Sequence, residues 1–208
     1  MTALTGLYAI TDAGLMPDTP TLLRQVEQSL LGGARLVQYR DKSNDTDNRL
    51  AQAKALRQLC QQYDVPLLIN DDIELAYGCL ANGVHLGQTD GTVVAARARL
   101  GPKAIIGVTC HADLTLAKQA VAAGADYVAF GACFPSRSKP DAQLAPLTLL
   151  QDASKQISCP IVAIGGISVD NARQVIDAGA GMVAVIHALF ASDDISATAQ
   201  QFSQLFPD

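Results

Sequence analysis

The sequence contains eight short apolar runs, each separated from the next by a longer stretch. The runs are GLYAIT (6–11), LVQY (36–39), PLLIN (66–70), GVHLG (83–87), AIIGV (104–108), DYVAFG (126–131), PIVAIGG (160–166) and GMVAVI (181–186). Such runs are typical of parallel strands that are covered on both faces. Between them, apolar residues recur at helical spacing, for example in 22–31, 49–63 and 114–123. Eight strands alternating with eight helices predict a parallel sheet with helical crossovers.

A glycine precedes every second predicted strand, at Gly33, Gly83, Gly124 and Gly179. This fourfold spacing favours a closed (β/α)8 TIM barrel over an open, doubly wound sheet. In the segment DNARQVIDAG we expect Asp170 to be the N-cap of a helix and Gly179 its C-cap. Because no linker or low-complexity segment interrupts the pattern, we predict a single domain over residues 1–208.

Composition excludes several classes of protein. With 49% hydrophobic residues and a net charge of −5, the chain is too apolar for intrinsic disorder and too acidic for a general nucleic-acid surface. The five cysteines are an odd number without a CxxC motif, which argues against a disulfide framework or a zinc site and suggests buried thiols in a reducing compartment. With no signal peptide or membrane span recognisable, we expect a cytoplasmic protein.

Polar side chains follow the predicted strands, where β/α barrels carry their active sites. Gln38, Arg40 and Lys42 alternate, which places them on one face of an extended segment. An amide, a guanidinium and an ammonium group together suit a phosphate or pyrophosphate. The alternative is that the cations form ion pairs with aspartates at the same end of the barrel, namely Asp41, Asp71 or Asp72.

Two aspartates, Asp71 and Asp90, follow the third and fourth predicted strands, which are neighbours roughly 5 Å apart. Two carboxylates this close either raise one pKa or share a cation. Oxygen ligands beside a basic phosphate site favour Mg²⁺ over zinc. General acid–base catalysis and N-capping of the next helix are the alternatives, and Asp72 suits the cap because it directly precedes IELAYGCL.

The longest connection, residues 131–146, contains Ser136, Arg137, Ser138 and Lys139. Its length is typical of an active-site lid, and its side chains can donate many hydrogen bonds to an anion. Gly165 and Gly166 follow the seventh strand, where barrels of this kind often bind phosphate. Two anion sites, one with a metal, indicate an enzyme that joins two phosphorylated molecules and releases pyrophosphate.

The three histidines receive different interpretations. His85 lies inside a predicted strand and is expected to be a hydrogen-bonded barrel residue. His111 is compatible with a proton shuttle but is more typical of a helix end. His187 follows the last strand and is expected near an anion.

Taken together, these segments resemble the thiamine-phosphate synthase family over nearly the whole chain. The segments are LYAITD, VQYRDK, LLINDD, GVHLGQTD, IIGVTCH, DYVAFGACFPSRSKP, VAIGGI and GMVAVIHALF. The resemblance implies a barrel transferase that condenses hydroxymethylpyrimidine pyrophosphate with thiazole phosphate, with Mg²⁺ as cofactor. It also implies a dissociative mechanism, in which a pyrimidine-stabilised carbocation is captured by the thiazole nitrogen.

The resemblance further implies a role for individual residues. Contacts to the pyrimidine pyrophosphate fall on Gln38, Tyr39, Arg40, Asp41, Lys42, Asn70, Thr109 and Lys139. Mg²⁺ ligands fall on Asp71 and Asp90, and contacts to the thiazole phosphate fall on Ser136, Arg137, Ser138, Gly166, Ile186 and His187. Arg40, Lys42 and Lys139 would be catalytic by stabilising the leaving pyrophosphate. His187 replaces the Ser or Asn that many members of the family carry.

Two other functions are compatible with such a barrel. One is a thiazole tautomerase of the same barrel group, and the other is a phosphate-binding regulatory module without turnover. The synthase is favoured because an isomerase has no leaving pyrophosphate to neutralise, which is the purpose of the complete set of Arg40, Lys42, Asp71, Asp90 and Lys139. The expected partners are phosphorylated small molecules, with no nucleic acid or membrane. Apolar helix faces are compatible with a homo-oligomer, although no feature identifies an interface.

Overall fold

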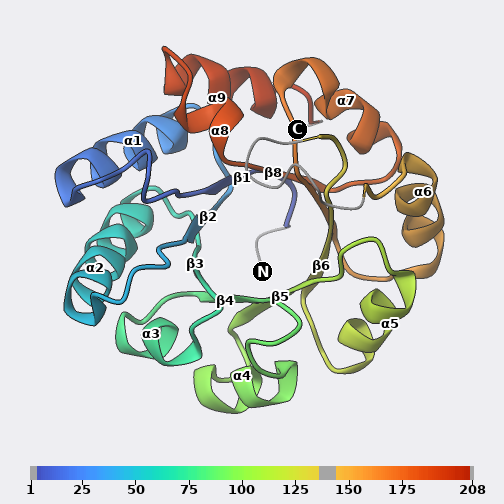
Figure 1. The fold of residues 1–208 in the computed structure, drawn as a ribbon, viewed down its shortest axis with the longest axis horizontal. Coiled ribbons are helices and arrows are strands. Elements are labelled where there is room, and N and C mark those ends of the chain that lie inside the picture. The colour runs from blue at the N-terminus through green and yellow to red at the C-terminus, as the bar shows by residue number, and fades with distance from the viewer. Residues whose placement is uncertain (1–3, 136–143, 207–208) are drawn as a thin grey trace.

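The chain forms a closed barrel of eight parallel strands surrounded by helices (Figure 1). The computed structural model describes residues 4–135 and 144–206. Each strand pairs with its neighbour in chain order, and the last pairs with the first. The strands are β1 Gly6–Ile10, β2 Leu36–Tyr39, β3 Leu67–Asn70, β4 Gly83–Leu86, β5 Ile105–Thr109, β6 Tyr127–Phe130, β7 Ile161–Ile164 and β8 Met182–Val185. All eight predicted strands and the predicted TIM barrel are confirmed.

Helices follow the strands around the outside of the barrel (Figure 1). They are α1 Thr19–Leu31, α2 Thr46–Gln62, α3 Ile73–Gly78, α4 Val93–Leu100, α5 Leu114–Ala122, α6 Leu147–Gln156, α7 Val169–Asp177, α8 His187–Phe190 and α9 Ile195–Ser203. The prediction of eight helices was therefore one short for the described residues, because β8 is followed by a short helix, α8, before the longer α9.

The predicted ends of α7 were wrong. Its N-cap is Ser168, and the Ser168 N–H donates to Asn171 Oδ1 at 2.9 Å in a capping box, whereas Asp170 lies in the first turn. The C-cap is Ala178, and Gly179 follows it with a φ of +106°. The expected cap of α3 is confirmed, because Asp72 Oδ1 accepts the Leu75 N–H at 2.8 Å.

The fourfold glycine spacing has two physical causes. Gly33, Gly124 and Gly179 have φ values of +97°, +93° and +106° after a helix, where a side chain would be strained. Gly83 is instead the first residue of β4, and a Cβ there would collide with the carbonyl group of Ile105 on β5. The regular spacing therefore combines helix ends with one close contact between strands.

Two separate buried clusters define the layers of the barrel. One contains residues of both strands and helices and fills the space between them, including Leu7 and Ala9 of β1. In the other, Tyr8 and Ile10 of β1 pack with buried residues from other strands. This second cluster is the barrel interior, since successive strand side chains point to opposite faces. Strand alternation therefore decides which side chains can reach a site inside the barrel.

The five cysteines are free thiols, and all but Cys159 are buried. Their burial matches the interpretation of small buried thiols in the core. Among the helices that the structure describes, none has the length and apolar character needed to cross a membrane.

Candidate active site

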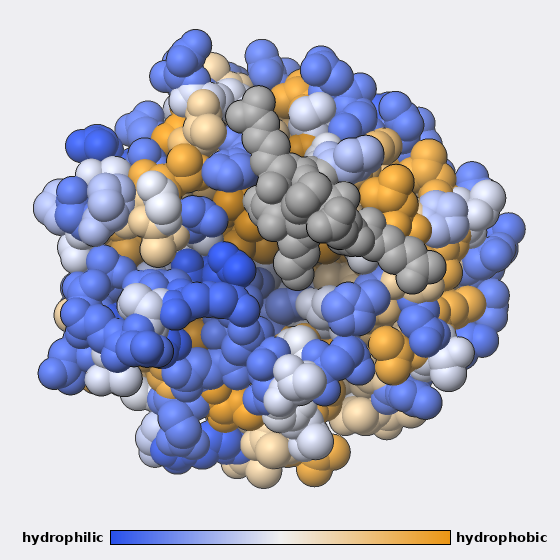
Figure 2. All heavy atoms as spheres, in the orientation of Figure 1, coloured by the Kyte–Doolittle hydropathy of each residue, from blue (hydrophilic) through white to orange (hydrophobic). Residues whose placement is uncertain are grey.

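A cavity of 1120 Å³ opens at the carboxyl ends of the strands, and all eight strands contribute to its wall. The predicted site residues that line it are Gln38, Arg40, Asn70, Thr109, Gly166, Ile186 and His187. These residues come from both predicted anion sites, so the structure joins the two sites in one cavity. In Figure 2, hydrophilic side chains gather beside the centre of this face, over α2, β3 and α3.

The residues after β2 are divided between two cavities. Gln38 and Arg40 line the large cavity, whereas Tyr39 and Asp41 line a second one of 250 Å³, together with Arg40. Tyr39 belongs to the outer apolar layer, and its hydroxyl donates to Gln52 Oε1 of α2 at 2.8 Å. Burial is the main cause that raises the pKa of Tyr39. The structure therefore does not bring Tyr39 and Asp41 into the large cavity with the other predicted contacts.

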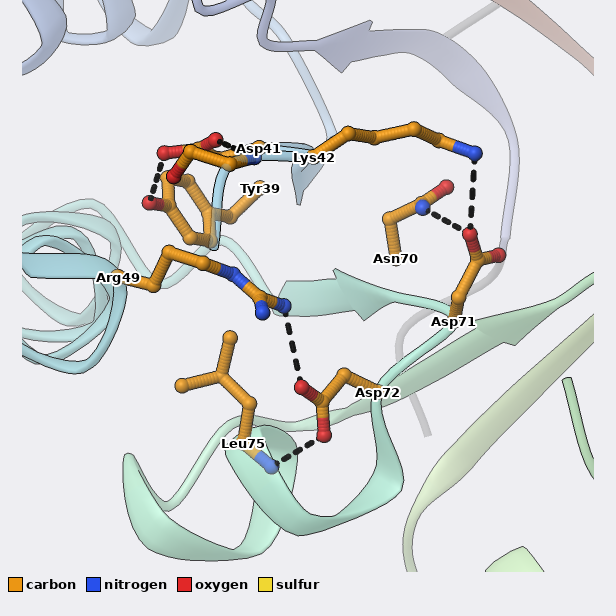
Figure 3. A network of polar contacts seen from close by, with 9 residues as sticks. Tyr39, Asp41, Lys42, Arg49, Asn70, Asp71, Asp72 and Leu75 are labelled. Atoms are coloured by element: carbon orange, nitrogen blue, oxygen red, sulfur yellow. Dashed lines mark hydrogen bonds and ion pairs between the residues drawn. The ribbon is translucent and has the colours of Figure 1, made fainter. Parts of the chain in front are cut away.

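Lys42 forms one of the ion pairs that the sequence left as an alternative. Its Nζ lies 3.6 Å from Asp71 Oδ2, while 63% of the side chain is exposed (Figure 3). The partner of Asp72 is Arg49 of α2, with Nη2 at 3.1 Å from Oδ2. Lys42 is thus held next to the carboxylates without being buried.

Asp71 lies directly after β3 with a left-handed φ of +63°. Asn70 Nδ2 donates to its Oδ2 at 2.6 Å (Figure 3). Burial and then the neighbouring Asp90 carboxylate raise the pKa of Asp71, and Lys42 opposes this rise. The structure therefore brings the two predicted metal ligands together in a partly buried place where their charges repel.

Asp90 reaches this place through a turn after β4. Its Oδ2 accepts the Gly87 N–H at 2.9 Å, and a Cβ at Gly87 would collide with the same oxygen. Two carboxylates suit Mg²⁺, which usually keeps several waters and takes one or two protein carboxylates together with substrate phosphate oxygens. Within residues 4–135 and 144–206, no cluster of three His, Cys, Asp or Glu residues offers a more complete metal site.

The opposite wall is formed by the segments after β7 and β8. Gly165 and Gly166 have φ values of +99° and +65°, and a Cβ at Gly166 would collide with the carbonyl oxygen of Pro135. The Gly166 carbonyl accepts from Asn171 Nδ2 at 3.0 Å, which ties this loop to α7. Ile186 is the N-cap of α8, and His187 is its first residue. Ser136, Arg137, Ser138 and Lys139 lie outside the described residues.

Five polar side chains form a hydrogen-bonded chain across the barrel interior. Gln38 Nε2 donates to Tyr8 Oη at 2.5 Å, and Tyr8 Oη lies 2.9 Å from Tyr127 Oη. Tyr127 Oη lies 2.8 Å from His85 Nδ1, and His85 Nε2 lies 2.8 Å from Thr109 Oγ1. The interpretation of His85 as a hydrogen-bonded barrel residue is confirmed, and burial lowers its pKa to about 4.

Tyr8 and Tyr127 were not predicted from the sequence as members of this chain. The available signal was a tyrosine inside each of two apolar strand runs, GLYAIT and DYVAFG, since a buried hydroxyl needs a partner. His111, in contrast, is exposed after β5 and borders the large cavity. It does not begin α5, because the N-cap of that helix is Asp113.

A closed parallel barrel with one large cavity at the carboxyl ends of its strands, lined by polar residues, defines a (β/α)8-barrel enzyme. Within this class, comparison with models of protein families identifies one family. A model described as thiamine monophosphate synthase covers residues 7–189, and the chain belongs to that family.

Individual relatives agree with this assignment. The chain is 53% identical over 202 residues to a thiamine-phosphate synthase of Saccharophagus degradans, covering 97% of this chain and 93% of that protein. It is 54% identical over 206 residues to a thiamine-phosphate synthase of Alcanivorax borkumensis, covering 98% of this chain and 94% of that protein. A solved structure, thiamine phosphate pyrophosphorylase from Pyrococcus furiosus, superimposes with a TM-score of 0.87 at 34% identity and covers 97% and 95% of the two chains.

Proposed function

We propose that this chain condenses hydroxymethylpyrimidine pyrophosphate with thiazole phosphate to form thiamine phosphate and pyrophosphate. The observation that carries the proposal is the single 1120 Å³ cavity, which is lined by residues assigned to both substrates. Ligand pockets usually measure about 300–1000 Å³, so this cavity is large enough for two reactants side by side. The name shared by the relatives supports the same reaction. In this proposal the protein acts on phosphorylated small molecules in the cytoplasm.

The reaction requires no nucleophile from the protein. The carbon–oxygen bond to pyrophosphate breaks, and its electron pair leaves with the pyrophosphate. The lone pair of the thiazole nitrogen then forms the new carbon–nitrogen bond to the resulting pyrimidine-stabilised cation. Arg40 and Lys42 would stabilise the negative charge that develops on the leaving group. Lys139 would share this role, and it lies outside the described residues.

Asp71 and Asp90 would hold Mg²⁺ in this reaction. The fit is chemical, because both ligands are hard oxygen donors. Burial and then the neighbouring Asp90 raise the pKa of Asp71, and a cation would favour the charged form of both carboxylates. When bound, Mg²⁺ would neutralise negative charge on the pyrophosphate. Asn70 would orient the Asp71 carboxylate through its hydrogen bond of 2.6 Å.

The wall formed by Gly166, Ile186 and His187 would bind the thiazole phosphate, together with Ser136, Arg137 and Ser138 of the segment outside the described residues. The support here is position, since Gly166 follows β7 and Ile186 and His187 follow β8 on the wall of the large cavity, where barrels of this kind often bind phosphate. Tyr39 and Asp41 would act through the placement of Arg40, because they share the second cavity with it.

The test is to incubate the purified protein with both substrates and Mg²⁺ and to measure thiamine phosphate and pyrophosphate. We expect the two products in equal amounts, and we expect Lys139→Ala to slow their formation by orders of magnitude. Lys155→Ala, which removes an exposed lysine of α6, is the matched control and should act like the wild type. A folded sample that forms no product would exclude the synthase. Conversion of a thiazole phosphate isomer alone would identify a tautomerase instead.

A further inference from the structure

The hydrogen-bonded chain from Gln38 to Thr109 can run in two directions, because either tyrosine hydroxyl can be the donor and the role of each His85 ring nitrogen depends on the tautomer. An amide nitrogen can only donate, so the Gln38 amide donates to Tyr8 Oη. Each tyrosine hydroxyl has one hydrogen. In the direction that starts at Gln38, each hydroxyl accepts one hydrogen bond and donates one, so the Tyr8 hydrogen is directed to Tyr127 Oη and the Tyr127 hydrogen to His85 Nδ1. In that direction His85 Nδ1 accepts, and the ring proton on Nε2 is donated to Thr109 Oγ1.

The imidazole in this chain is neutral at ordinary pH. Burial lowers the pKa of His85 to about 4, and burial also raises the pKa values of Tyr8 and Tyr127. A neutral imidazole has one donor and one acceptor, which is what a chain with a single direction requires.

Packing fixes the three rings in place. The His85 and Tyr127 rings are stacked with centroids 5.6 Å apart, and the Tyr8 and Tyr127 rings meet edge to face at 6.0 Å. A Cβ at Gly107 of β5 would collide with the Tyr127 ring, so this glycine provides the space for the tyrosine. The rings come from three different strands, and the two tyrosines and the histidine are buried.

We propose that the chain runs from Gln38 to Thr109 and that Tyr8, Tyr127 and His85 are positioning residues, which together orient the Gln38 amide and make the Thr109 hydroxyl a hydrogen-bond donor to the substrate. Both ends of the chain line the 1120 Å³ cavity. With its amide nitrogen engaged by Tyr8, Gln38 offers its Oε1 as an acceptor. Since Thr109 Oγ1 accepts from His85, its own hydrogen is left for a ligand. A heteroaromatic ring with both a donor and an acceptor on its edge fits this pair. The substrate part of the inference rests on the proposed function, in which Gln38 and Thr109 contact the pyrimidine.

The first test is the tautomer of His85, measured by NMR on protein labelled with ¹⁵N at histidine. His85→Gln assigns the signals, because the sequence has three histidines. We expect a neutral ring that is protonated at Nε2. In Tyr127→Phe, the donor to Nδ1 is lost, and we expect a mixture of tautomers. An Nδ1-protonated ring in the wild type would mean that the chain runs the opposite way, and it would overturn the inference.

The second test is kinetic. Tyr8→Phe and Tyr127→Phe should each raise KM for the pyrimidine substrate about 3- to 10-fold, the effect of one hydrogen bond, while KM for the thiazole phosphate stays unchanged. Thr109→Ser should retain the wild-type KM. Thr109→Val should raise KM for the pyrimidine substrate as much as Tyr127→Phe does, and the double variant should show no further increase. Tyr63→Phe, which removes a hydroxyl bonded to Glu27, is the matched control.

Equal changes in both KM values, or additive effects in the double variant, would reduce the three residues to a purely structural role and overturn the inference. The NMR test needs no substrate. An inactive protein with the Nε2 tautomer would therefore refute the proposed function alone, whereas an active protein with the Nδ1 tautomer would refute only the positioning role.

Discussion

Asp71 is a single carboxylate on which neighbouring groups act in opposite directions. Burial and Asp90 favour its protonated form, whereas Lys42 and Asn70 favour the charged form, and the pKa is raised overall. We expect Asp71→Asn to raise the Mg²⁺ concentration required for activity at least about tenfold, because a metal ligand is weakened. The measurement is the reaction rate over a magnesium titration. A wild-type titration curve would contradict the role of Asp71 as a ligand.

The adjacent Asp72 provides the control for this variant. It caps α3 and pairs with Arg49 instead of facing Asp90. Asp72→Asn should therefore keep the wild-type magnesium requirement and lower the thermal stability. If both variants shift the magnesium requirement equally, the effect comes from general disturbance of the segment after β3.

His85 links the stability of the protein to pH. Its pKa falls from 6.5 to about 4 on folding, so between these values the unfolded state binds the proton and the folded state does not. The stability contributed by the neutral ring is present above pH 6.5 and is lost as the pH falls toward 4, by up to about 3 kcal/mol. Denaturant unfolding at several pH values should show this loss in the wild type and a smaller one in His85→Gln. If the free energy of unfolding changed with pH equally in both proteins, this prediction would be contradicted.

At the scale of elements, the turn after β4 decides whether Asp90 reaches Asp71. The turn depends on Gly87, because a side chain there would collide with the Asp90 carboxylate. Gly87→Ala should displace Asp90 and raise the magnesium requirement at least about tenfold, in the same direction as Asp71→Asn. The control is Gly78→Ala in α3, where a Cβ would meet only ordinary contact with Leu50. A wild-type magnesium titration in Gly87→Ala would show that the turn tolerates the methyl group.

The strands were predictable because parallel strands covered on both faces are apolar along most of their length, as PIVAIGG and GMVAVI illustrate. Helix ends were harder to predict, because several polar residues near an end compete for the same N–H groups. In α7 the predicted cap was Asp170, but the reciprocal hydrogen bonds between Ser168 and Asn171 make Ser168 the cap. The extra helix α8 is only four residues long, too short to show a helical period.

Strand alternation explains which part of the site was predictable. Side chains alternate along β2 and the residues after it. Gln38 and Arg40 are on the side that lines the large cavity, whereas Tyr39 and Asp41 are on the other side and line the second cavity. The link between Tyr8 and Tyr127 could not be seen in the sequence, because the two residues are 119 positions apart and meet only when the barrel closes.

At the scale of the whole molecule, barrel closure brings β1 next to β8 and therefore places the two walls of the cavity in one closed sheet. An acidic chain with a net charge of −5 can still bind an anion, because Arg40 and Lys42 lie at the same mouth as the proposed metal ligands. Binding at this mouth should then stabilise the entire fold, since a ligand that binds only the folded state shifts the unfolding equilibrium.

This linkage gives a prediction that needs no turnover. Mg²⁺ and pyrophosphate together, at a hundred times their dissociation constant, should raise Tm by about 5–10 °C. Either one alone should raise it less, because the metal and the anion complete each other's binding site. Arg40→Gln should reduce the shift, whereas Arg24→Gln, which removes an exposed charge on α1, should leave it unchanged. Differential scanning fluorimetry measures all these shifts. Equal shifts in the two arginine variants would mean that Arg40 contributes no more to pyrophosphate binding than an exposed arginine far from the site, and would contradict the proposed site.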